Sequence, residues 1–223
     1  MKPEKRLFDL FFASALLLLT FPLLLVIAGA LRLENRGTIF FKRRRHGLNS
    51  VPFEIFKFRT YPPGAARATG LGEFLRRTCL DELPQLWNVL KGELSLVGPR
   101  PLDVDESDAL AEQFPLHHAR HAVRPGITGS GQVMGMRGTL DEPEKAKRLL
   151  YDLKYAAKNS VWGDLKILVQ TPYCVAQKFI QTRGVWLDTS RWQNSGGPNA
   201  SALAADETSI PTPGCLTVAE LGA

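Results

Sequence analysis

Residues 78–92 read Thr78-Cys79-Leu80-Asp81-Glu82-Leu83-Pro84-Gln85-Leu86-Trp87-Asn88-Val89-Leu90-Lys91-Gly92. Proline is tolerated in the first turn of a helix, where its missing N–H would be unpaired anyway, so a helix is expected to begin near Asp81 or Glu82. Gly92 is a typical helix stop. The apolar residues follow an i, i+3, i+4, i+7 spacing that buries one face: Leu83, Leu86, Trp87 and Leu90. The segment therefore predicts a short, half-buried helix that opens on two carboxylates.

The adjacent carboxylates have two interpretations. Asp81 and Glu82 could simply cap the helix, because unpaired N–H groups and the helix dipole favour acidic first turns. A short distance later, however, the chain holds an arginine between two prolines, in Gly98-Pro99-Arg100-Pro101. Prolines stiffen the backbone on both sides of Arg100, as a preorganised phosphate ligand requires. A nucleophile, a metal ligand and a phosphate binder within one stretch indicate phosphoryl chemistry.

Composition limits the partners and the compartment. The chain has 223 residues, enough for one domain with a real core, and a net charge of +6. Such a chain is expected to bind anions: nucleotides, phosphorylated lipids, a membrane surface or nucleic acid. Its three cysteines are far apart and suit neither a disulfide framework nor a metal site, which favours a reducing compartment.

The N-terminal segment is long and apolar. From Leu10 to Leu31 it is interrupted by few polar side chains, and about 20 apolar residues can span a bilayer. A secretory signal is the alternative, but the run exceeds the usual core of about 7–15 apolar residues, and Asp9 precedes it. We therefore predict a retained membrane element.

Basic residues flank this element on both sides: Lys2, Lys5 and Arg6 before it, and Arg32, Arg36, Lys42, Arg43, Arg44 and Arg45 after it. Since positive flanks stay on the cytoplasmic side, one straight helix cannot satisfy both. Pro22 lies near the middle and permits a bend. A re-entrant helix-break-helix and a single kinked span both remain open on these residues. Asp9 needs a partner at the membrane edge, and Arg6 on the same helical face is the expected one.

Strands are expected on both sides of Gly47, around residues 38–41 and 52–60. In the second strand Lys57 and Arg59 would share a face, either lining a diphosphate site or facing solvent. Helices are expected over 103–122, 142–159 and 164–181, the last interrupted by Pro172 and amphipathic enough for an interface. We interpret His117, His118 and His121 as a polar helix face rather than a metal site. From about Asp188 the composition predicts a disordered tail.

These motifs together resemble the bacterial sugar transferase family, the small monotopic phosphoglycosyl transferases. The resemblance covers roughly residues 5–171. Its motifs, in order, are Lys5-Arg6-x-x-Asp9, Lys57-Phe58-Arg59-Thr60, the 80–92 segment, Ser95-Leu96-Val97-Gly98-Pro99-Arg100-Pro101 and Arg124-Pro125-Gly126-Ile127-Thr128-Gly129. It implies an α+β fold: a re-entrant helix-break-helix joined to a small, mostly helical cytoplasmic catalytic domain with a short β element and interfacial amphipathic helices. The implied boundaries are 1–36 for the membrane segment, 37–187 for the catalytic domain and 188–223 for the tail.

The family resemblance also implies an activity. A UDP-sugar would donate its sugar phosphate to a polyprenyl phosphate such as undecaprenyl phosphate, releasing UMP, on the cytoplasmic face of a bacterial inner membrane. By position, Asp81 is the nucleophile that forms an aspartyl-phosphosugar intermediate, and Glu82 is the ligand of Mg²⁺. Membrane lipids and downstream glycosyltransferases are expected partners, with no role for nucleic acid. The resemblance names neither the sugar nor the oligomeric state.

Further site residues follow from the family motifs. The expected substrate-binding residues are Lys57, Arg59, Arg76, Pro99, Arg100, Pro101, Arg124, Gln132 and Arg137, and the expected membrane-anchoring residues are Lys5, Arg6, Asp9 and Pro22. The chain departs from the family pattern at Phe21, Arg43, Tyr61, Cys79, Ser130 and Met136. At Phe21 a serine hydroxyl is usual, and Thr20 is the candidate substitute. A basic, membrane-anchored binding protein without chemistry is the alternative, which salt-sensitive binding without turnover would favour.

Overall fold

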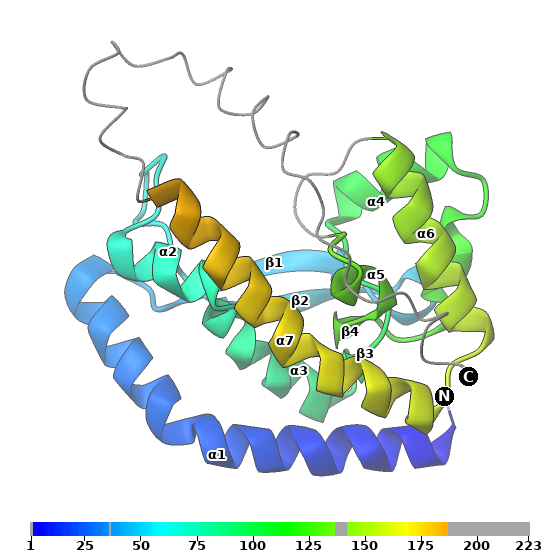
Figure 1. Ribbon diagram of the computed structural model, residues 1–223, viewed down its shortest axis with the longest axis horizontal. Coiled ribbons are helices and arrows are strands. Elements are labelled where there is room, and N and C mark those ends of the chain that lie inside the picture. The colour runs from blue at the N-terminus through cyan, green and yellow to red at the C-terminus, as the bar shows by residue number, and fades with distance from the viewer. Residues whose placement is uncertain (1, 36, 137–141, 187–223) are drawn as a thin grey trace.

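The computed structural model describes residues 2–35, 37–136 and 142–186 of the chain, so Arg137 and the expected tail at 188–223 lie outside the described residues. The helices are α1 (Pro3–Asn35), α2 (Gly70–Arg77), α3 (Leu86–Lys91), α4 (Val104–Gln113), α5 (Ser130–Val133), α6 (Glu142–Ala157) and α7 (Val161–Trp186). Three 3-10 helices complete them: η1 (Leu48–Ser50), η2 (Leu80–Gln85) and η3 (His117–Ala122). With two small sheets, the fold is α+β and mostly helical, as expected (Figure 1).

The first sheet is an antiparallel hairpin of β1 (Phe40–His46) and β2 (Pro52–Phe58), in a register that pairs Phe41 with Lys57 and Arg43 with Ile55. Both strands were expected, although β1 extends through the arginine run. The second sheet pairs β3 (Ser95–Val97) with β4 (Gly126–Thr128) in parallel. This pair joins the two glycine-proline motifs of the sequence and holds them side by side.

Helix α1 is long and apolar enough to cross a membrane by length and composition, over Pro3–Glu34. It contains Pro22 without interruption and bends along its length (Figure 1). A proline inside a helix removes one backbone bond and is the usual cause of such a bend. The Thr20 hydroxyl donates to the carbonyl of Leu16. Pro22 has no N–H to donate to the carbonyl of Leu18, four residues earlier. The Thr20 hydroxyl does not replace this donor, because it bonds the Leu16 carbonyl instead.

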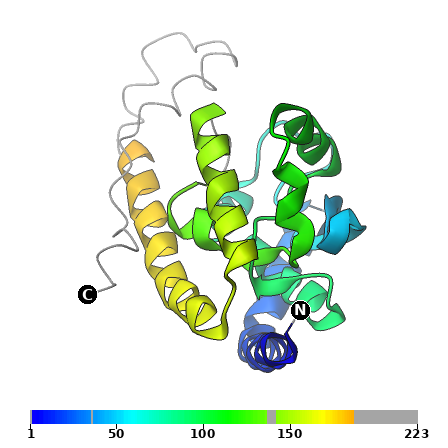
Figure 2. The same ribbon diagram turned by 90° about the vertical axis from the view of Figure 1, so that its right-hand side faces the viewer.

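The two arms of α1 pack against different parts of the domain. Ala13 belongs to the main core cluster with Leu86 and Val89 of α3. Farther along, Ile27 and Leu31 pack against Phe58 of β2 and Leu75 of α2. Figure 2 shows α1 nearly end-on beneath the rest of the fold. Most side chains of the long apolar segment nonetheless remain exposed, as a helix surrounded by lipid would require.

Polar side chains at the start of α1 fasten it to the domain. Buried Lys5 pairs with Asp164 at the start of α7 and donates to the Val97 carbonyl at 3.1 Å. Asp9 accepts from the Ser95 hydroxyl at 3.0 Å and from the Leu96 N–H at 3.1 Å. These contacts fix the angle at which α1 leaves the domain.

The expected ion pair between Arg6 and Asp9 was wrong. The Arg6 guanidinium instead donates to the carbonyls of Val89 and Leu90, at 2.7 and 2.8 Å. These carbonyls end α3, and the C-terminal end of a helix favours a cation. The Val89 carbonyl also accepts from the Gly92 N–H at 3.0 Å, so Arg6 adds a second donor there.

Three local expectations also need correction. The helix over the acidic pair is not one α-helix: η2 carries both carboxylates, and α3 begins after it, at Leu86. Pro172 does not interrupt α7. Residues His117 and His121 do not form a solvated face, because both side chains are buried. Gly92 does end α3, in the left-handed conformation with φ of 87°.

Candidate active site

A cavity of about 860 Å³ opens between the β1–β2 hairpin, η2, the Arg100 loop, α1 and α7. Its wall has three chemical parts. The cationic side chains are Arg43, Arg45, Lys57, Arg59, Arg76, Arg77 and Arg100. The carboxylates are Glu73, Asp81 and Glu82. Apolar side chains from α1 and α7, namely Leu16, Leu168 and Val175, also line the wall.

The hairpin supplies cations from two neighbouring strands. Because alternate residues of a strand share a face, Arg43 and Arg45 point the same way from β1, and Lys57 points the same way as Arg59 from the end of β2. All four line the cavity. The hairpin therefore presents a cationic surface to one side of the site.

Both carboxylates reach the cavity from a tight turn. Cys79 adopts the left-handed conformation, with φ of 56°, and turns the chain out of α2 into η2. The Asn88 side chain then ties α3 to β2, donating to the Glu54 carbonyl at 2.7 Å and accepting from the Phe56 N–H at 3.0 Å. This link sets η2 opposite the cationic end of β2.

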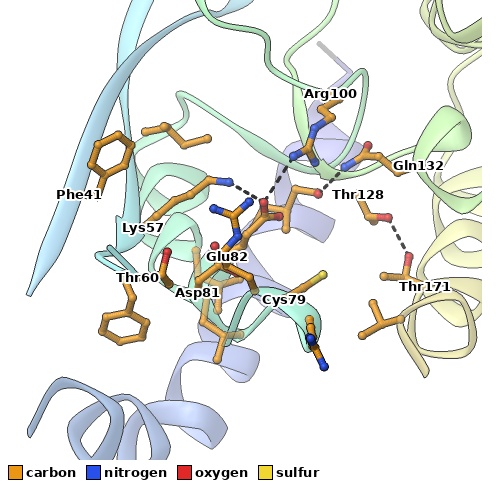
Figure 3. Close-up of a pocket in the computed structure, with 18 of the residues that line it drawn as sticks. Phe41, Lys57, Thr60, Cys79, Asp81, Glu82, Arg100, Thr128, Gln132 and Thr171 are labelled. Atoms are coloured by element: carbon orange, nitrogen blue, oxygen red, sulfur yellow. Dashed lines mark hydrogen bonds and ion pairs between the residues drawn. The ribbon is translucent and has the colours of Figure 1, made fainter. Parts of the chain in front are cut away.

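Glu82 is held by two cations from different parts of the fold. Lys57 Nζ lies 2.5 Å from Glu82 Oε1, and Arg100 Nη2 lies 3.6 Å from the same oxygen. Figure 3 shows the Lys57 and Arg100 side chains converging on Glu82, with Asp81 beside it. Two half-buried cations on one carboxylate make a compact, oriented charge cluster.

Other expected site residues also meet at the cavity. Arg59, Arg76 and Gln132 line it. The Arg76 guanidinium lies over the Tyr61 ring, 5.0 Å from its centroid, and donates to the Tyr61 hydroxyl at 2.8 Å. The Gln132 amide donates to the Ile127 carbonyl at 2.8 Å. Tyr61, a departure from the family pattern, thus orients one of the cavity cations.

Some expected residues lie elsewhere. Arg124 is not part of the cavity wall; its Nε donates to the Gly92 carbonyl at 2.6 Å, beside Arg6. Burial, and then the charge of Arg6, lowers the pKa of Arg124. Pro99 is buried behind Arg100, and Pro101 borders a small adjoining hollow. Both prolines therefore support Arg100 rather than face the cavity.

The sequence reasoning missed three cavity cations. Arg43 was noted as a departure and as a flanking basic residue, and Arg45 only as a flanking basic residue, while Arg77 was not considered. The alternation of β1 would have placed Arg43 and Arg45 on one face had the strand been extended through them. Thr128 was quoted as part of a family motif but given no role, and Thr171 was not considered. Their hydroxyls lie 2.8 Å apart at the cavity wall, a contact that the sequence does not indicate because β4 and α7 meet only in the folded chain.

Comparison with known proteins shows what this chain is similar to. The family model described as bacterial sugar transferase matches residues 2–178. A UDP-glucose:undecaprenyl-phosphate glucose-1-phosphate transferase of Klebsiella pneumoniae is 41% identical over 182 residues, covering 76% of this chain and 39% of that protein. A protein of the same name from Caulobacter vibrioides is 41% identical, covering 75% and 68%.

A further relative carries a different sugar in its name. A UDP-N-acetylgalactosamine-undecaprenyl-phosphate N-acetylgalactosaminephosphotransferase of Aeromonas hydrophila is 34% identical, covering 75% of this chain and 42% of that protein. The chain spans about two fifths of the length of the Klebsiella relative.

Proposed function

Because this chain belongs to the bacterial sugar transferase family, we propose that it transfers a sugar phosphate from a UDP-sugar to a polyprenyl phosphate. The observation that carries the proposal is the placement of Asp81 and Glu82 in one cavity with Lys57 and Arg100. A carboxylate can accept a phosphoryl group when cations neutralise the diphosphate and hold it in line.

The proposed reaction has two steps. An oxygen of Asp81 attacks the phosphorus that bears the sugar, the bond from that phosphorus to the bridging oxygen breaks, and UMP leaves. The acceptor phosphate oxygen then attacks the same phosphorus, which releases the Asp81 carboxylate and forms a polyprenyl diphosphate sugar. Lys57, Arg59, Arg76 and Arg100 stabilise the phosphate charges in both steps.

We further propose Mg²⁺ as the cofactor. Asp81 and Glu82 supply hard carboxylate oxygens at the same cavity, and Mg²⁺ is usually bound by one or two carboxylates together with substrate phosphates. The donor chemistry therefore fits, with Glu82 as the protein ligand. When bound, the ion would neutralise diphosphate charge. Within the described residues, no group of three or more histidine, cysteine or acidic side chains is arranged to hold a metal without substrate.

The apolar part of the cavity suits the acceptor. Leu16 of α1 and Leu168 and Val175 of α7 line it, and both helices carry exposed apolar side chains outside the cavity. A polyprenyl phosphate has an apolar chain and an anionic head. Its chain would lie against α1 and α7 while its phosphate reaches the cations.

We place the enzyme on the cytoplasmic face of a bacterial inner membrane, with α1 re-entrant. The bend of α1 and the basic residues on both sides of it support this topology (Figure 1). Tags at the two ends of the chain should then both be accessible only from the cytoplasm. Replacing the proline, in Pro22→Ala, should shift one end to the periplasm, and a periplasmic end in the wild type would contradict re-entry.

The covalent step is directly testable. Detergent-solubilised protein is incubated with UDP-glucose or UDP-N-acetylgalactosamine, polyprenyl phosphate and Mg²⁺, and UMP release is measured. Mass spectrometry after incubation with donor alone should show a sugar-phosphate adduct on Asp81. Asp81→Asn should abolish both signals. Glu73→Gln, a change to another carboxylate of the same cavity, should retain the adduct.

These measurements distinguish a transferase that uses Asp81 as its nucleophile from a binding protein without chemistry. An adduct in the wild type that survives Asp81→Asn would rule out Asp81 as the nucleophile. Salt-sensitive binding to anionic lipid, with no UMP from a panel of UDP-sugars, would instead indicate a binding protein.

A further inference from the structure

The loop that carries Arg100 is held through its carbonyl groups. Four consecutive carbonyls accept hydrogen bonds: Pro99 from Gly126 N at 2.9 Å, Arg100 from Arg120 Nη2 at 2.6 Å, Pro101 from Arg45 Nη1 at 3.1 Å and Leu102 from His46 N at 3.3 Å. Prolines have no N–H, so a loop with two of them depends on carbonyl acceptors to be fixed. The backbone of Arg100 is therefore anchored by a side chain, that of Arg120.

Arg120 is itself rigidly placed. It lies on η3, is 2% exposed, and forms an ion pair with Asp152 of α6 at 2.6 Å. Asp152 is equally buried. Burial raises the pKa of Asp152, whereas the charge of Arg120 lowers it. The Asp152 carboxylate and the Arg100 carbonyl both contact the same nitrogen, Arg120 Nη2, so this buried arginine has little freedom to move.

Arg120 does not line the large cavity, so it can influence the site only through its neighbours. The neighbour it contacts is Arg100, whose guanidinium reaches Glu82 (Figure 3). At 3.6 Å, the Arg100–Glu82 contact is long enough that a small backbone shift would break it.

We propose that Arg120, backed by Asp152, is a positioning residue that aims the Arg100 guanidinium at the Glu82 carboxylate and the donor phosphates. This inference rests on the proposed transferase function. It assigns a role in the reaction to a residue pair on η3 and α6, outside the cavity.

A double-mutant cycle tests the proposal. The pair Arg120→Met and Asp152→Leu is changed together, because a buried ion pair replaced by apolar side chains can leave stability nearly unchanged. The Arg100 carbonyl then loses its donor without a buried charge being left unpaired. The same pair is also introduced into Arg100→Ala protein. UMP release gives kcat and KM for the donor, and thermal unfolding in detergent reports stability.

We expect the paired change to lower kcat/KM about 10- to 100-fold in otherwise wild-type protein, the size associated with a misplaced catalytic contact. In Arg100→Ala protein the same change should lower kcat/KM less than about twofold, because the guanidinium that Arg120 positions is already absent. Arg6→Met is the matched control. The Arg6 guanidinium also donates to backbone carbonyls outside the cavity, those of Val89 and Leu90, so its loss should cost the same factor in both backgrounds.

Equal losses from the Arg120 and Asp152 pair in both backgrounds would overturn the positioning role while leaving the transferase function intact. Wild-type protein that releases no UMP would overturn the proposed function itself. If the paired variant does not fold, the conservative Arg120→Lys replaces it in the same cycle. If Arg120→Lys lowers kcat/KM only in protein that retains the Arg100 side chain, that result also supports the proposal.

Discussion

Lys57 and Glu82 form a half-buried ion pair of 2.5 Å between the end of β2 and the 3-10 helix η2. The same hairpin holds a matched pair in solvent, since Lys42 lies 3.2 Å from Glu54 with both side chains more than half exposed. An exposed pair contributes little because water and salt screen it, whereas a partly buried pair orients its charges. The half-buried Lys57 and the exposed Lys42, both on the hairpin, can therefore be compared directly by mutation.

Lys57→Met should lower kcat/KM about 100- to 1000-fold, the loss typical of removing one preorganised donor from a phosphoryl or oxyanion site. Glu82 would lose this short contact and keep the longer one with Arg100. UMP release at saturating polyprenyl phosphate measures the effect. Lys42→Met should stay within about twofold, because exposed pairs contribute little. Equal losses in both variants would mean that charge on the hairpin, rather than the Lys57 contact, matters.

The buried lysine of α1 gives a prediction about stability. Lys5→Met should destabilise the protein by about 3–5 kcal/mol, because it leaves Asp164 buried without its cation. Burial already raises the pKa of Asp164, and Lys5 opposes that shift. Lys5→Met combined with Asp164→Leu should recover most of the loss. Denaturant unfolding in detergent measures both, and a double variant no better than the single one would show that the pair has no coupled role.

Tight packing beside the Arg100 loop predicts a contrast between two glycines. A Cβ at Gly126 would come within 2.0 Å of the Gly98 N atom, where β3 and β4 pair. Gly126→Ala should therefore destabilise by about 1–3 kcal/mol, as overpacked sites do. Gly29, in α1, has open space around its Cβ position, so Gly29→Ala should be neutral or stabilising by about 0.5–1 kcal/mol. Thermal unfolding compares the two, and equal effects would contradict the packing argument.

Much of the local structure could be predicted from the sequence. The apolar spacing and the glycine at 92 correctly predicted a short, half-buried helix and its end. Two members of the expected buried face differ, because Leu83 lies in η2 and Trp87 is 53% exposed. Strand alternation correctly placed Lys57 and Arg59 on a common face, and of the two alternatives left open, a site or solvent, that face lines the cavity. These features depend on neighbours along the chain, so a periodic pattern is sufficient to find them.

The misses share a physical cause, which is competition from distant groups. Arg6 has Asp9 within one helical turn, yet it binds the carbonyls that end α3, more than eighty residues away. The Nε of Arg124 likewise donates to a distant carbonyl, that of Gly92, and its expected role as a phosphate ligand stays a prediction. Carbonyls at the C-terminal end of a helix are acceptors for cationic side chains, and only the fold determines which side chain reaches them.

Buried histidines predict an acid limit to stability. His117 and His121 have pKa values lowered from 6.5 to about 4 and about 3, chiefly by burial and then by the charge of Arg120. Both lie within hydrogen-bond distance of a serine hydroxyl: His117 Nε2 is 3.0 Å from Ser107, and His121 Nδ1 is 2.8 Å from Ser50. Above pH 6.5 they are neutral in the folded and the unfolded chain, so their contribution to stability is fully present.

As the pH falls below 6.5, both histidines become protonated in the unfolded chain. In the folded chain His117 is protonated only near pH 4 and His121 only near pH 3, so the free energy of unfolding falls. Burial raises the pKa of Asp152 and of Asp164, which acts in the opposite direction, so the test is a difference between proteins. The midpoint of thermal unfolding, measured from pH 7 to pH 4, should fall less steeply in His117→Gln/His121→Gln than in the wild type. Equal slopes in the two proteins would show that these histidines do not limit stability in acid.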